Sequence, residues 1–331
     1  MDEELVSTPG SDQVVDLSRS GPVTMQMTVL QQAAVERKQA RRERWQLLRR
    51  RPGFLIGAGI SLFWVVCAVL YDRITPFDPF DDLSTPLARP GGEHWFGTDQ
   101  IGRDVLSRVM AGSRDVLVIA PISAVISVVT GTLLGLVMGY YRGLVDDVLS
   151  RIVEAFLALP VVLVGLLALV TFGSSEPENG FLRWTLKILT LGASEPVVVI
   201  VVAVLFTPIV ARTVRAAVMA ERDLDYVTSA RLRGETNLFI MTREILPNIV
   251  GPIVVELTVR IGYAIFTVAT LSFLGVGVQP PSPDWGLIIS DHYSLMNGGI
   301  WWPTLFPALA IASLVIAVNL IADSIQAVND R

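Results

Sequence analysis

Four long stretches of this 331-residue chain contain no charged side chain, and this feature constrains its fold more than any other. Each is 17 to 24 residues long: Phe54–Leu70, Val116–Gly139, Ala155–Gly173 and Pro303–Ala322. A helix rises 1.5 Å per residue, so about 20 residues cross the ~30 Å hydrocarbon core of a bilayer. The composition agrees, because 52% of the residues are hydrophobic, only 17% are charged and the mean hydropathy is +0.55. These values are typical of an integral membrane protein.

Two weaker apolar stretches complete the predicted set of spans. Val197–Ala211 is short, and Ile249–Gly275 is long but is interrupted by two charged residues. The first span is not a signal peptide, because 53 mostly polar residues precede it. We therefore predict an all-α integral membrane protein with six transmembrane helices, over residues 54–71, 116–140, 155–173, 195–216, 249–273 and 303–324.

Basic side chains indicate how the chain is oriented, because they are enriched in cytoplasmic loops. Eight of them crowd the approach to the first span, namely Arg37, Lys38, Arg41, Arg42, Arg44, Arg49, Arg50 and Arg51. This predicts a cytoplasmic N-terminus and, with six spans, a cytoplasmic C-terminus. The loop 274–302 is then external and contains no Lys or Arg. The external loop 72–115 argues against this orientation, because it carries Arg73, Arg89, Arg103, Arg108 and Arg114.

Residues 1–53 are expected to form a cytoplasmic N-terminal tail. Residues 1–36 are polar and lack sustained periodicity, which favours disorder. The stretch Gln31–Leu48 has the pattern of a basic amphipathic helix lying near anionic lipid headgroups. A charge cluster that only fixes the topology explains the same residues equally well.

The end of loop 72–115 predicts an interfacial helix on the external membrane surface, over Gly102–Asp115. Asp104 and Arg108 would form an i,i+4 pair on one face, opposite an apolar face made of Ile101, Val105, Leu106, Val109 and Met110. Packing at the interface and a surface beneath a docked binding protein are both consistent with this pattern.

The second span carries small residues at every fourth position, all on one helix face: Ser123, Ser127, Gly131, Gly135 and Gly139. Small residues at this spacing allow another helix backbone to approach closely in lipid. The stripe therefore predicts a tight helix contact, within the chain or across a subunit boundary, and no transport chemistry.

The segment 219–248 is polar to mixed, although it lies between two apolar runs. Its first part predicts a short amphipathic helix ending at Gly234, a residue suited to a helix C-terminus. A second helix is expected to start after Glu235 or Thr236 and to run to Pro247, where the next span begins. The sequence thus predicts a helix–glycine–helix elbow at the membrane surface, although a simple connecting loop fits the composition as well.

Glu256 and Arg260 lie one turn apart inside the fifth span. Charged residues at membrane depth usually face the protein interior or a water-filled path. The pair is therefore a candidate lining of a translocation path, and a self-neutralising pair that only positions helices is the alternative. Neither His94 nor His292 has a partner at metal-ligand spacing, so no metal site is predicted. The sequence contains no G-x-x-x-x-G-K-[ST] loop.

The elbow resembles the EAA loop by which permease subunits of ABC importers contact their ATPase. That pattern has Glu-Ala-Ala, three further residues, a glycine, and a Leu-Pro that ends thirteen positions after the glycine; here these positions are Thr228, Ser229, Ala230, Gly234, Leu246 and Pro247. The spacing matches, while Thr228 and Ser229 depart from Glu-Ala. The resemblance implies an ATPase-coupling loop formed by Asp223, Asp225, Tyr226, Ser229, Ala230, Arg231, Gly234, Leu246 and Pro247.

Three further segments are similar to one family of such permeases, the C-type subunits of dipeptide, oligopeptide and nickel importers. They are the stretch from His94 to Asp104, the stretch Leu271–Pro281 followed by Trp285 and Gly286, and Gly139–Tyr141 with Asp146, Arg151 and Pro160. The family usually has a glutamate before the Leu-Ser-Phe-Leu-Gly motif, where this chain has Val268. Together the matching segments cover most of residues 94–325 in the expected order.

The resemblance implies a type I ABC importer permease with its core in residues 116–331. Such a subunit works in a bacterial cell membrane with a paralogous permease, two ATPase subunits that bind ATP and Mg²⁺, and an extracytoplasmic substrate-binding protein. The chain itself would then be no enzyme, hold no cofactor, contact membrane lipid and bind no nucleic acid. A di- or oligopeptide is the expected substrate, with nickel or another small solute as the alternative. An ion-coupled secondary transporter is a competing function, and an intramembrane enzyme lacks its catalytic residues.

Overall fold

The computed structural model describes residues 46–81, 84–172 and 195–329. The chain divides into two units, Met1–Pro52 and Gly53–Arg331. The expected disordered tail (residues 1–36) and most of the expected amphipathic helix Gln31–Leu48 lie outside the described residues. The account that follows concerns the second unit.

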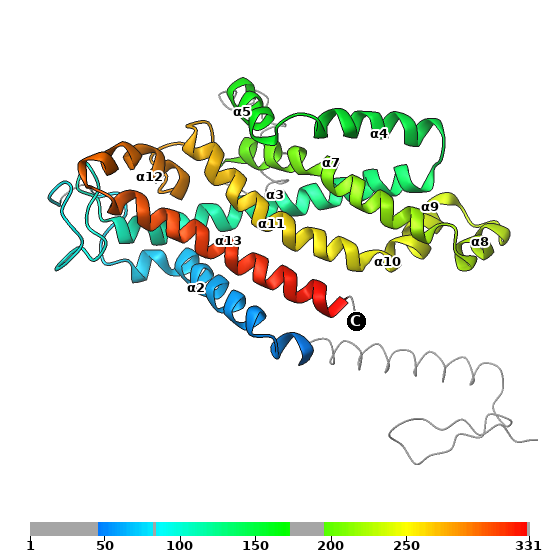
Figure 1. The fold of residues 1–331 in the computed structure, drawn as a ribbon, viewed down its shortest axis with the longest axis horizontal. Helices are drawn as coiled ribbons and strands as arrows, with labels where there is room; N and C mark the ends of the chain where they lie inside the picture. The colour runs from blue at the N-terminus through cyan, green and yellow to red at the C-terminus, as the bar shows by residue number, and fades with distance from the viewer. Residues whose placement is uncertain (1–45, 82–83, 173–194, 330–331) are drawn as a thin grey trace, which may run out of the picture. The chain divides into compact units, whose positions relative to one another are not determined.

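Five helices of the described residues are long and apolar enough to cross a membrane: α2 (Pro52–Ile74), α3 (Val105–Tyr140), α7 (Pro196–Glu221), α11 (Val250–Phe273) and α13 (Trp302–Asn329). Figure 1 labels each of them. A sixth span is obtained if α4 (Leu144–Leu157) and α5 (Val161–Phe172) are counted as one bent span. The described residues otherwise form short helices, turns and two isolated β-bridges. The predicted all-α membrane fold is therefore confirmed.

The third predicted span, 155–173, is not one continuous helix. Helix α4 ends at Leu157, α5 begins at Val161, and the two helices meet at an angle of 89°. Pro160 lies at the break, where it has no N–H to donate and disfavours a helical conformation in the preceding residue. The residues before the break form an amphipathic helix of their own, which a search for charge-free stretches does not detect.

The expected interfacial helix over Gly102–Asp115 is not a separate element, and this corrects the expected external loop 72–115. Helix α3 begins at Val105 and continues for 36 residues, about 54 Å, so it is longer than the bilayer core is thick. Asp104 caps this helix by accepting a hydrogen bond from the backbone N–H of Ser107 at 2.8 Å, and it also contacts Nδ1 of His94 at 2.9 Å. Arg108 is buried and faces Asp99 rather than Asp104, with its Nε 3.8 Å from the Asp99 carboxylate.

The stripe of small residues on α3 packs against α7, so the predicted contact lies within this chain. A β-carbon added to Gly131, Gly135 or Gly139 would lie 2.6–2.7 Å from a β-carbon of α7, that of Val210, Val214 and Val218 respectively. Real β-carbons do not approach this closely, so only glycine allows the two helices this separation. Ser123 and Ser127 are fully buried and hydrogen-bond to carbonyls of their own helix, which removes the cost of burying their hydroxyls.

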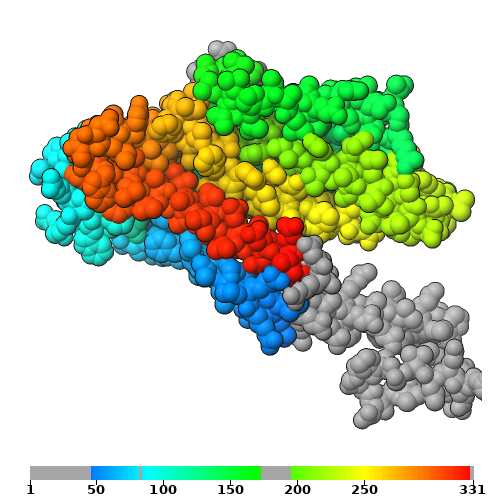
Figure 2. All heavy atoms as spheres, in the orientation of Figure 1, coloured from blue at the N-terminus to red at the C-terminus, as the bar shows by residue number. Residues whose placement is uncertain are grey.

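Helix α13 lies between α2 and α11 on the face shown in Figure 2. Gly57 allows α2 to approach α13 closely, because an added β-carbon would meet the carbonyl oxygen of Ala317 at 2.5 Å. Trp64 of α2 donates a hydrogen bond to the hydroxyl of Ser313 at 2.9 Å and packs edge-on against Trp285. Trp285 begins α12 (Trp285–His292), a short helix that is followed by the 3₁₀ turn η3 (Tyr293–Gly298) before α13.

Candidate coupling site and intramembrane ion pair

The predicted elbow is present as two short helical limbs between α7 and α11. The first limb is α8 (Asp225–Leu232), and the second comprises α9 (Asn237–Phe239), the π-helix η2 (Ile240–Ile245) and α10 (Leu246–Asn248). Gly234 lies between the limbs with a φ of +78°. Figure 1 shows the elbow at the end of α7 from which the chain returns into α11.

The glycine ends the first limb by a specific hydrogen-bond pattern. The N–H of Gly234 bonds to the carbonyl of Arg231 at 3.0 Å, and the N–H of Glu235 bonds to the carbonyl of Ala230 at 3.2 Å. These two bonds form a Schellman motif, which satisfies helix-end carbonyls and requires a left-handed residue at the glycine position. Thr236 then starts the second limb, because its hydroxyl accepts a hydrogen bond from the N–H of Phe239 at 3.3 Å.

The second limb widens into a π-helix just before Pro247. Proline has no N–H with which to bond to the carbonyl of Arg243, so an ordinary helical turn cannot close at this position. The N–H of Leu246 bonds to the carbonyl of Met241 instead, five residues back. Single π-turns inside helices are frequently found at functional sites.

One face of each limb is buried against the helix bundle. Val227 and Ala230 of the first limb and Ile240 and Ile245 of the second are all 0% exposed. They belong to one hydrophobic cluster that includes residues of α3 and α7, among them Leu136, Val214 and Val218. Because both limbs bury side chains in the same cluster, the elbow is anchored to the bundle and is not a loose connection.

Arg222 ties the elbow to the end of α3, a role that the sequence analysis did not assign. Its side chain is 95% buried, and its guanidinium group donates hydrogen bonds to the carbonyls of Gly139 and Tyr140, at 2.9 and 3.0 Å. These carbonyls belong to the last turn of α3, which has no intrahelical donors for them and attracts a positive charge. A basic residue just after a long helix is a weak signal of such a contact, because the sequence does not reveal which helix end it meets.

Tyr140 connects the same helix end to both limbs of the elbow. Its hydroxyl donates a hydrogen bond to the side-chain oxygen of Asn237 at 2.9 Å. The guanidinium carbon of Arg231 lies 5.5 Å from the centre of its ring, within the range of a cation–π contact. Displacement of either limb would therefore act on α3 as well as on α7.

The remaining residues of the predicted coupling loop occupy different parts of the elbow. Asp223 precedes the first limb and pairs with Arg142, and Asp225 begins the limb, where a carboxylate interacts favourably with the helix dipole. Tyr226 donates a hydrogen bond to Glu221 at 2.6 Å; burial and this bond raise the pKa of Tyr226 to about 12, so the phenol stays protonated at neutral pH. Ser229 and Pro247 are exposed, and Leu246 is half-buried.

Apolar side chains project from the elbow although it lies outside the spanning helices. Leu232 is 85% exposed and Leu238 is 67% exposed, one on each side of Gly234. Leu224 and Phe239 are also exposed. Exposed apolar groups outside the bilayer-spanning segments are typical of a protein–protein contact.

Replacing Gly234 by valine is expected to loosen the elbow without unfolding the bundle. A β-carbon at this position would meet no atom within 4 Å, so the cost comes from the left-handed backbone alone and is about 1–2 kcal/mol. Local opening should become about 5–30 times more frequent, measured as faster limited trypsin cleavage at Arg231 and Arg233. Gly234→Asn is the matched control, because asparagine tolerates this conformation. Equal cleavage rates for the two variants would contradict the prediction.

Glu256 and Arg260 form the predicted pair inside α11. Nε of Arg260 donates to Oε2 of Glu256 at 2.8 Å, and both residues are buried. The hydroxyl of Thr213, on α7, donates to the other carboxylate oxygen at 2.7 Å. The guanidinium carbon lies 5.8 Å from the ring centre of Phe206 and 5.0 Å from that of Tyr263. The pair therefore links α11 to α7, a partnership that spacing within α11 could not reveal.

Among the described residues, no group of three or more His, Cys, Asp and Glu side chains is arranged to hold a metal ion. His94 contacts Asp104, as described above. Nδ1 of His292 lies 2.7 Å from the carbonyl oxygen of Ile288, one turn back in its own helix. Both imidazoles thus have contacts that belong to the fold.

Comparison with known proteins identifies the family. A model of the family described as "Binding-protein-dependent transport system inner membrane component" matches residues 131–331, a range that includes α7, the elbow and α11. This chain belongs to that family. The resemblance to importer permease subunits, which the motifs indicate, agrees with this family, and the relatives described next confirm it for permeases of peptide importers.

Three relatives that are named as transport permeases match this chain over nearly their whole length. The dipeptide transport system permease of Haemophilus influenzae is 36% identical over 291 residues, which cover 86% of this chain and 92% of that protein. The di/tripeptide transport system permease of Pseudomonas aeruginosa is 34% identical and is covered to 90% of its length. The glutathione transport system permease of Pectobacterium atrosepticum is also 34% identical, with 89% of its length covered. Each comparison covers 86% of this chain.

Proposed function

We propose that this inner-membrane component is the permease subunit of an ATP-driven importer of di- or oligopeptides. In this proposal the N- and C-termini and the elbow lie in the cytoplasm, and a separate ATPase docks on the elbow. The observation that carries the proposal is the elbow itself, which is anchored on its buried face and exposes Leu232 and Leu238 on the other.

The complex would contain the partners that this family's mechanism requires. A paralogous permease would supply the second half of the translocation path, two ATPase subunits would bind ATP and Mg²⁺, and an extracytoplasmic binding protein would deliver the substrate. The names of the relatives, which include dipeptide and di/tripeptide permeases, favour a peptide over nickel or another small solute.

The contacts of the elbow suggest how ATP binding would move the spanning helices. Two ATPase subunits that close on ATP would displace the elbow, which is continuous with α7 and α11. The displacement would also reach α3, because Arg222 and Tyr140 connect the elbow to its last turn. ATP can favour one state of the permease only if the ATP-bound and ATP-free forms of the ATPase bind the elbow differently.

The Glu256–Arg260 pair is proposed to lie along the wall of the translocation path. It joins α7 and α11, the two helices that leave the elbow, through the hydroxyl of Thr213. Rotation of either helix would change this contact, so the pair is placed where a gate would respond to the elbow. Uptake that persists after collapse of the proton gradient would separate this importer from an ion-coupled transporter in which Glu256 carries protons.

Placing a charge at the tip of the elbow is expected to release the ATPase. The double change Leu232→Asp and Leu238→Asp puts two carboxylates where an apolar contact is proposed, and burial of an unpaired carboxylate in such a contact costs about 2 kcal/mol or more. Co-purified ATPase should fall by at least about tenfold, while the yield of monodisperse permease stays unchanged. Phe80→Asp is the control, because it introduces one carboxylate at an exposed aromatic residue away from the elbow, in the loop between α2 and α3.

Two outcomes would overturn this proposal. Retention of the ATPase by the Leu232→Asp, Leu238→Asp variant would show that the elbow is not its docking surface. Labelling of Arg231→Cys by a membrane-impermeant reagent in intact cells would place the elbow on the external side, where no ATPase could reach it.

A further inference from the structure

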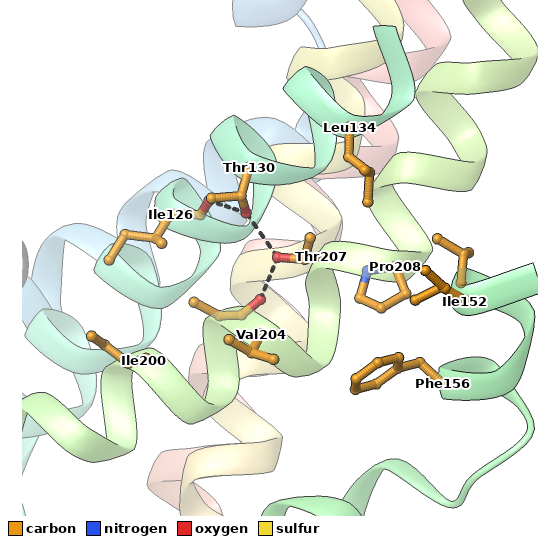
Figure 3. A pocket seen from close by; sticks show the side chains of 11 residues that line it. Ile126, Thr130, Leu134, Ile152, Phe156, Ile200, Val204, Thr207 and Pro208 are labelled. Atoms are coloured by element: carbon orange, nitrogen blue, oxygen red, sulfur yellow. Dashed lines mark hydrogen bonds between the residues drawn. The ribbon is translucent and has the colours of Figure 1, made fainter. Parts of the chain in front are cut away.

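A groove of about 390 Å³ lies between α3, α4 and α7, away from the elbow and from the Glu256–Arg260 pair. Its volume is within the range of roughly 300–1,000 Å³ found for sites that hold small molecules. Figure 3 shows Ile152 and Phe156 of α4 on one side of the opening, with Val204 and Pro208 of α7 facing them. Thr130 of α3 and the remaining side chains complete the lining.

The lining of this groove suits a hydrocarbon chain and little else. Among the described residues that line it, the only side-chain polar groups are the hydroxyls of Thr130 and Thr207. These hydroxyls lie 2.8 Å apart and bond to the carbonyls of Ile126 and Ala203 in their own helices, both at 2.8 Å. Because both hydroxyl protons are already donated to carbonyls, a polar ligand would lose its hydrogen bonds with water and find no side-chain donor in the groove to replace them. An aliphatic ligand loses nothing by entering.

The position of the groove in the fold indicates the source of such a chain. Its α3 and α7 walls, including Thr130 and Thr207, lie in helices that are long and apolar enough to span the membrane. The groove is therefore lined by membrane-spanning segments, where phospholipid acyl chains are the abundant aliphatic molecules. A soluble apolar ligand would first have to enter the bilayer.

Arg212 supplies a charge next to the groove. It continues the row of Val204 and Pro208 along α7 by one more turn, since residues four apart share a helix face. Arg212 is exposed, and within the part of the chain that the structure describes it has no hydrogen-bond or ion-pair partner. Two other arginines in this region are paired, Arg215 with Asp146 at 2.6 Å and Arg151 with Glu154 at 3.5 Å.

An unpaired arginine on a spanning helix needs an anionic or water-filled surrounding, because burial of an unpaired charge in hydrocarbon is costly. A phosphate group is a suitable partner, since a guanidinium can donate two parallel hydrogen bonds to it. We infer that the groove between α3, α4 and α7 binds one phospholipid, with an acyl chain against Phe156 and Val204 and its phosphate on Arg212. The lipid fills the space between α4 and the bundle.

Photolabelling tests this inference on the full chain in its complex with the partner permease and ATPase. The complex is reconstituted into vesicles of phosphatidylethanolamine and phosphatidylglycerol that contain a small fraction of phosphatidylglycerol with a diazirine in one acyl chain. After irradiation, mass spectrometry should find lipid adducts concentrated on the peptides that contain Ile152–Phe156 or Val204–Pro208. Val204→Trp, which fills the groove, should lower this labelling about tenfold.

The second variant tests the headgroup contact. Arg212→Gln should lower groove labelling about fivefold, the factor that corresponds to about 1 kcal/mol for one basic residue near a lipid phosphate. Val69→Trp on the exposed face of α2 is the control and should change nothing at the groove. Monodisperse elution verifies the fold of each variant, so the lipid readout on the permease does not depend on the outcome of the ATPase test.

Three results would overturn the inference. Adducts spread equally over the groove and the exposed face of α2 would indicate ordinary surrounding lipid. Groove labelling that is insensitive to both Val204→Trp and Arg212→Gln would show that these residues do not hold the lipid. A photoreactive residue at position 156 that captures the partner permease instead of phospholipid would assign the groove to the contact between subunits.

Discussion

Replacing Gly135 by leucine is expected to abolish the packing of α3 against α7 and with it the folded permease. Even a β-carbon at this position would lie 2.7 Å from both the carbonyl oxygen of Ala211 and the β-carbon of Val214. One extra methylene in a packed interior typically costs 1–3 kcal/mol, and leucine adds three carbons beyond the β-carbon. The helices would have to separate along the whole stripe, which runs through the centre of the bundle.

The control for this prediction is Gly251, another glycine inside a helix. A β-carbon there would meet no atom within 4 Å, so Gly251→Ala should be neutral or stabilise α11 by up to about 1 kcal/mol through helix propensity. Size-exclusion chromatography of detergent-solubilised membranes should show aggregation or loss of the Gly135→Leu protein and a normal peak for Gly251→Ala. A monodisperse Gly135→Leu protein with unchanged thermal stability would refute the close contact.

Replacing Glu256 by leucine is expected to destabilise the bundle severely, because it leaves Arg260 without its carboxylate partner. Arg260 is only 9% exposed, and its guanidinium otherwise contacts the rings of Phe206 and Tyr263. Removal of one member of a buried ion pair typically costs 3–5 kcal/mol, because the remaining charge is uncompensated. The thermal unfolding midpoint of the purified complex should therefore fall markedly.

The double variant Glu256→Leu, Arg260→Leu separates the two roles considered for this pair. Removing both charges should restore most of the stability, since a buried ion pair replaced by apolar groups is often neutral. If the pair also lines the path, ATP-driven uptake of a radiolabelled peptide should stay low in the restored protein. Normal uptake together with restored stability would leave the pair only a structural role.

The spans and the elbow could be predicted because their signals are local. A run of apolar residues must hydrogen-bond its own backbone in lipid, so length and absence of charge suffice to locate α2, most of α3 and α13. Gly234 is similarly informative, because the left-handed residue after a helix is usually glycine. The spacing from Gly234 to Pro247 fixes the length of the second limb in the same way.

The features that were not predicted depend on contacts between distant residues or on competing local signals. The break near Pro160 lies inside an uninterrupted apolar run, so hydropathy concealed a bend of 89°. Arg108 looked like an exposed partner of Asp104, whereas tertiary packing buries it beside Asp99. Arg222 and Tyr140 join the elbow to α3 across 82 residues of sequence, and nothing in their own neighbourhood indicates which helix end they meet.

The glycine stripe also limits how the bundle can change shape. Each glycine of the stripe faces one valine of α7 on successive turns, so the side chains of the two helices interlock. The facing pairs are Gly131 with Val210, Gly135 with Val214 and Gly139 with Val218. A shift of one residue along the axis would drive each valine against the bulkier side chains between the glycines, so gradual sliding is blocked. The next register that fits is four residues away, about 6 Å along the helix axis. We therefore expect α3 and α7 to move together as one rigid body. A displacement of their ends at the elbow should then reach their opposite ends without loss.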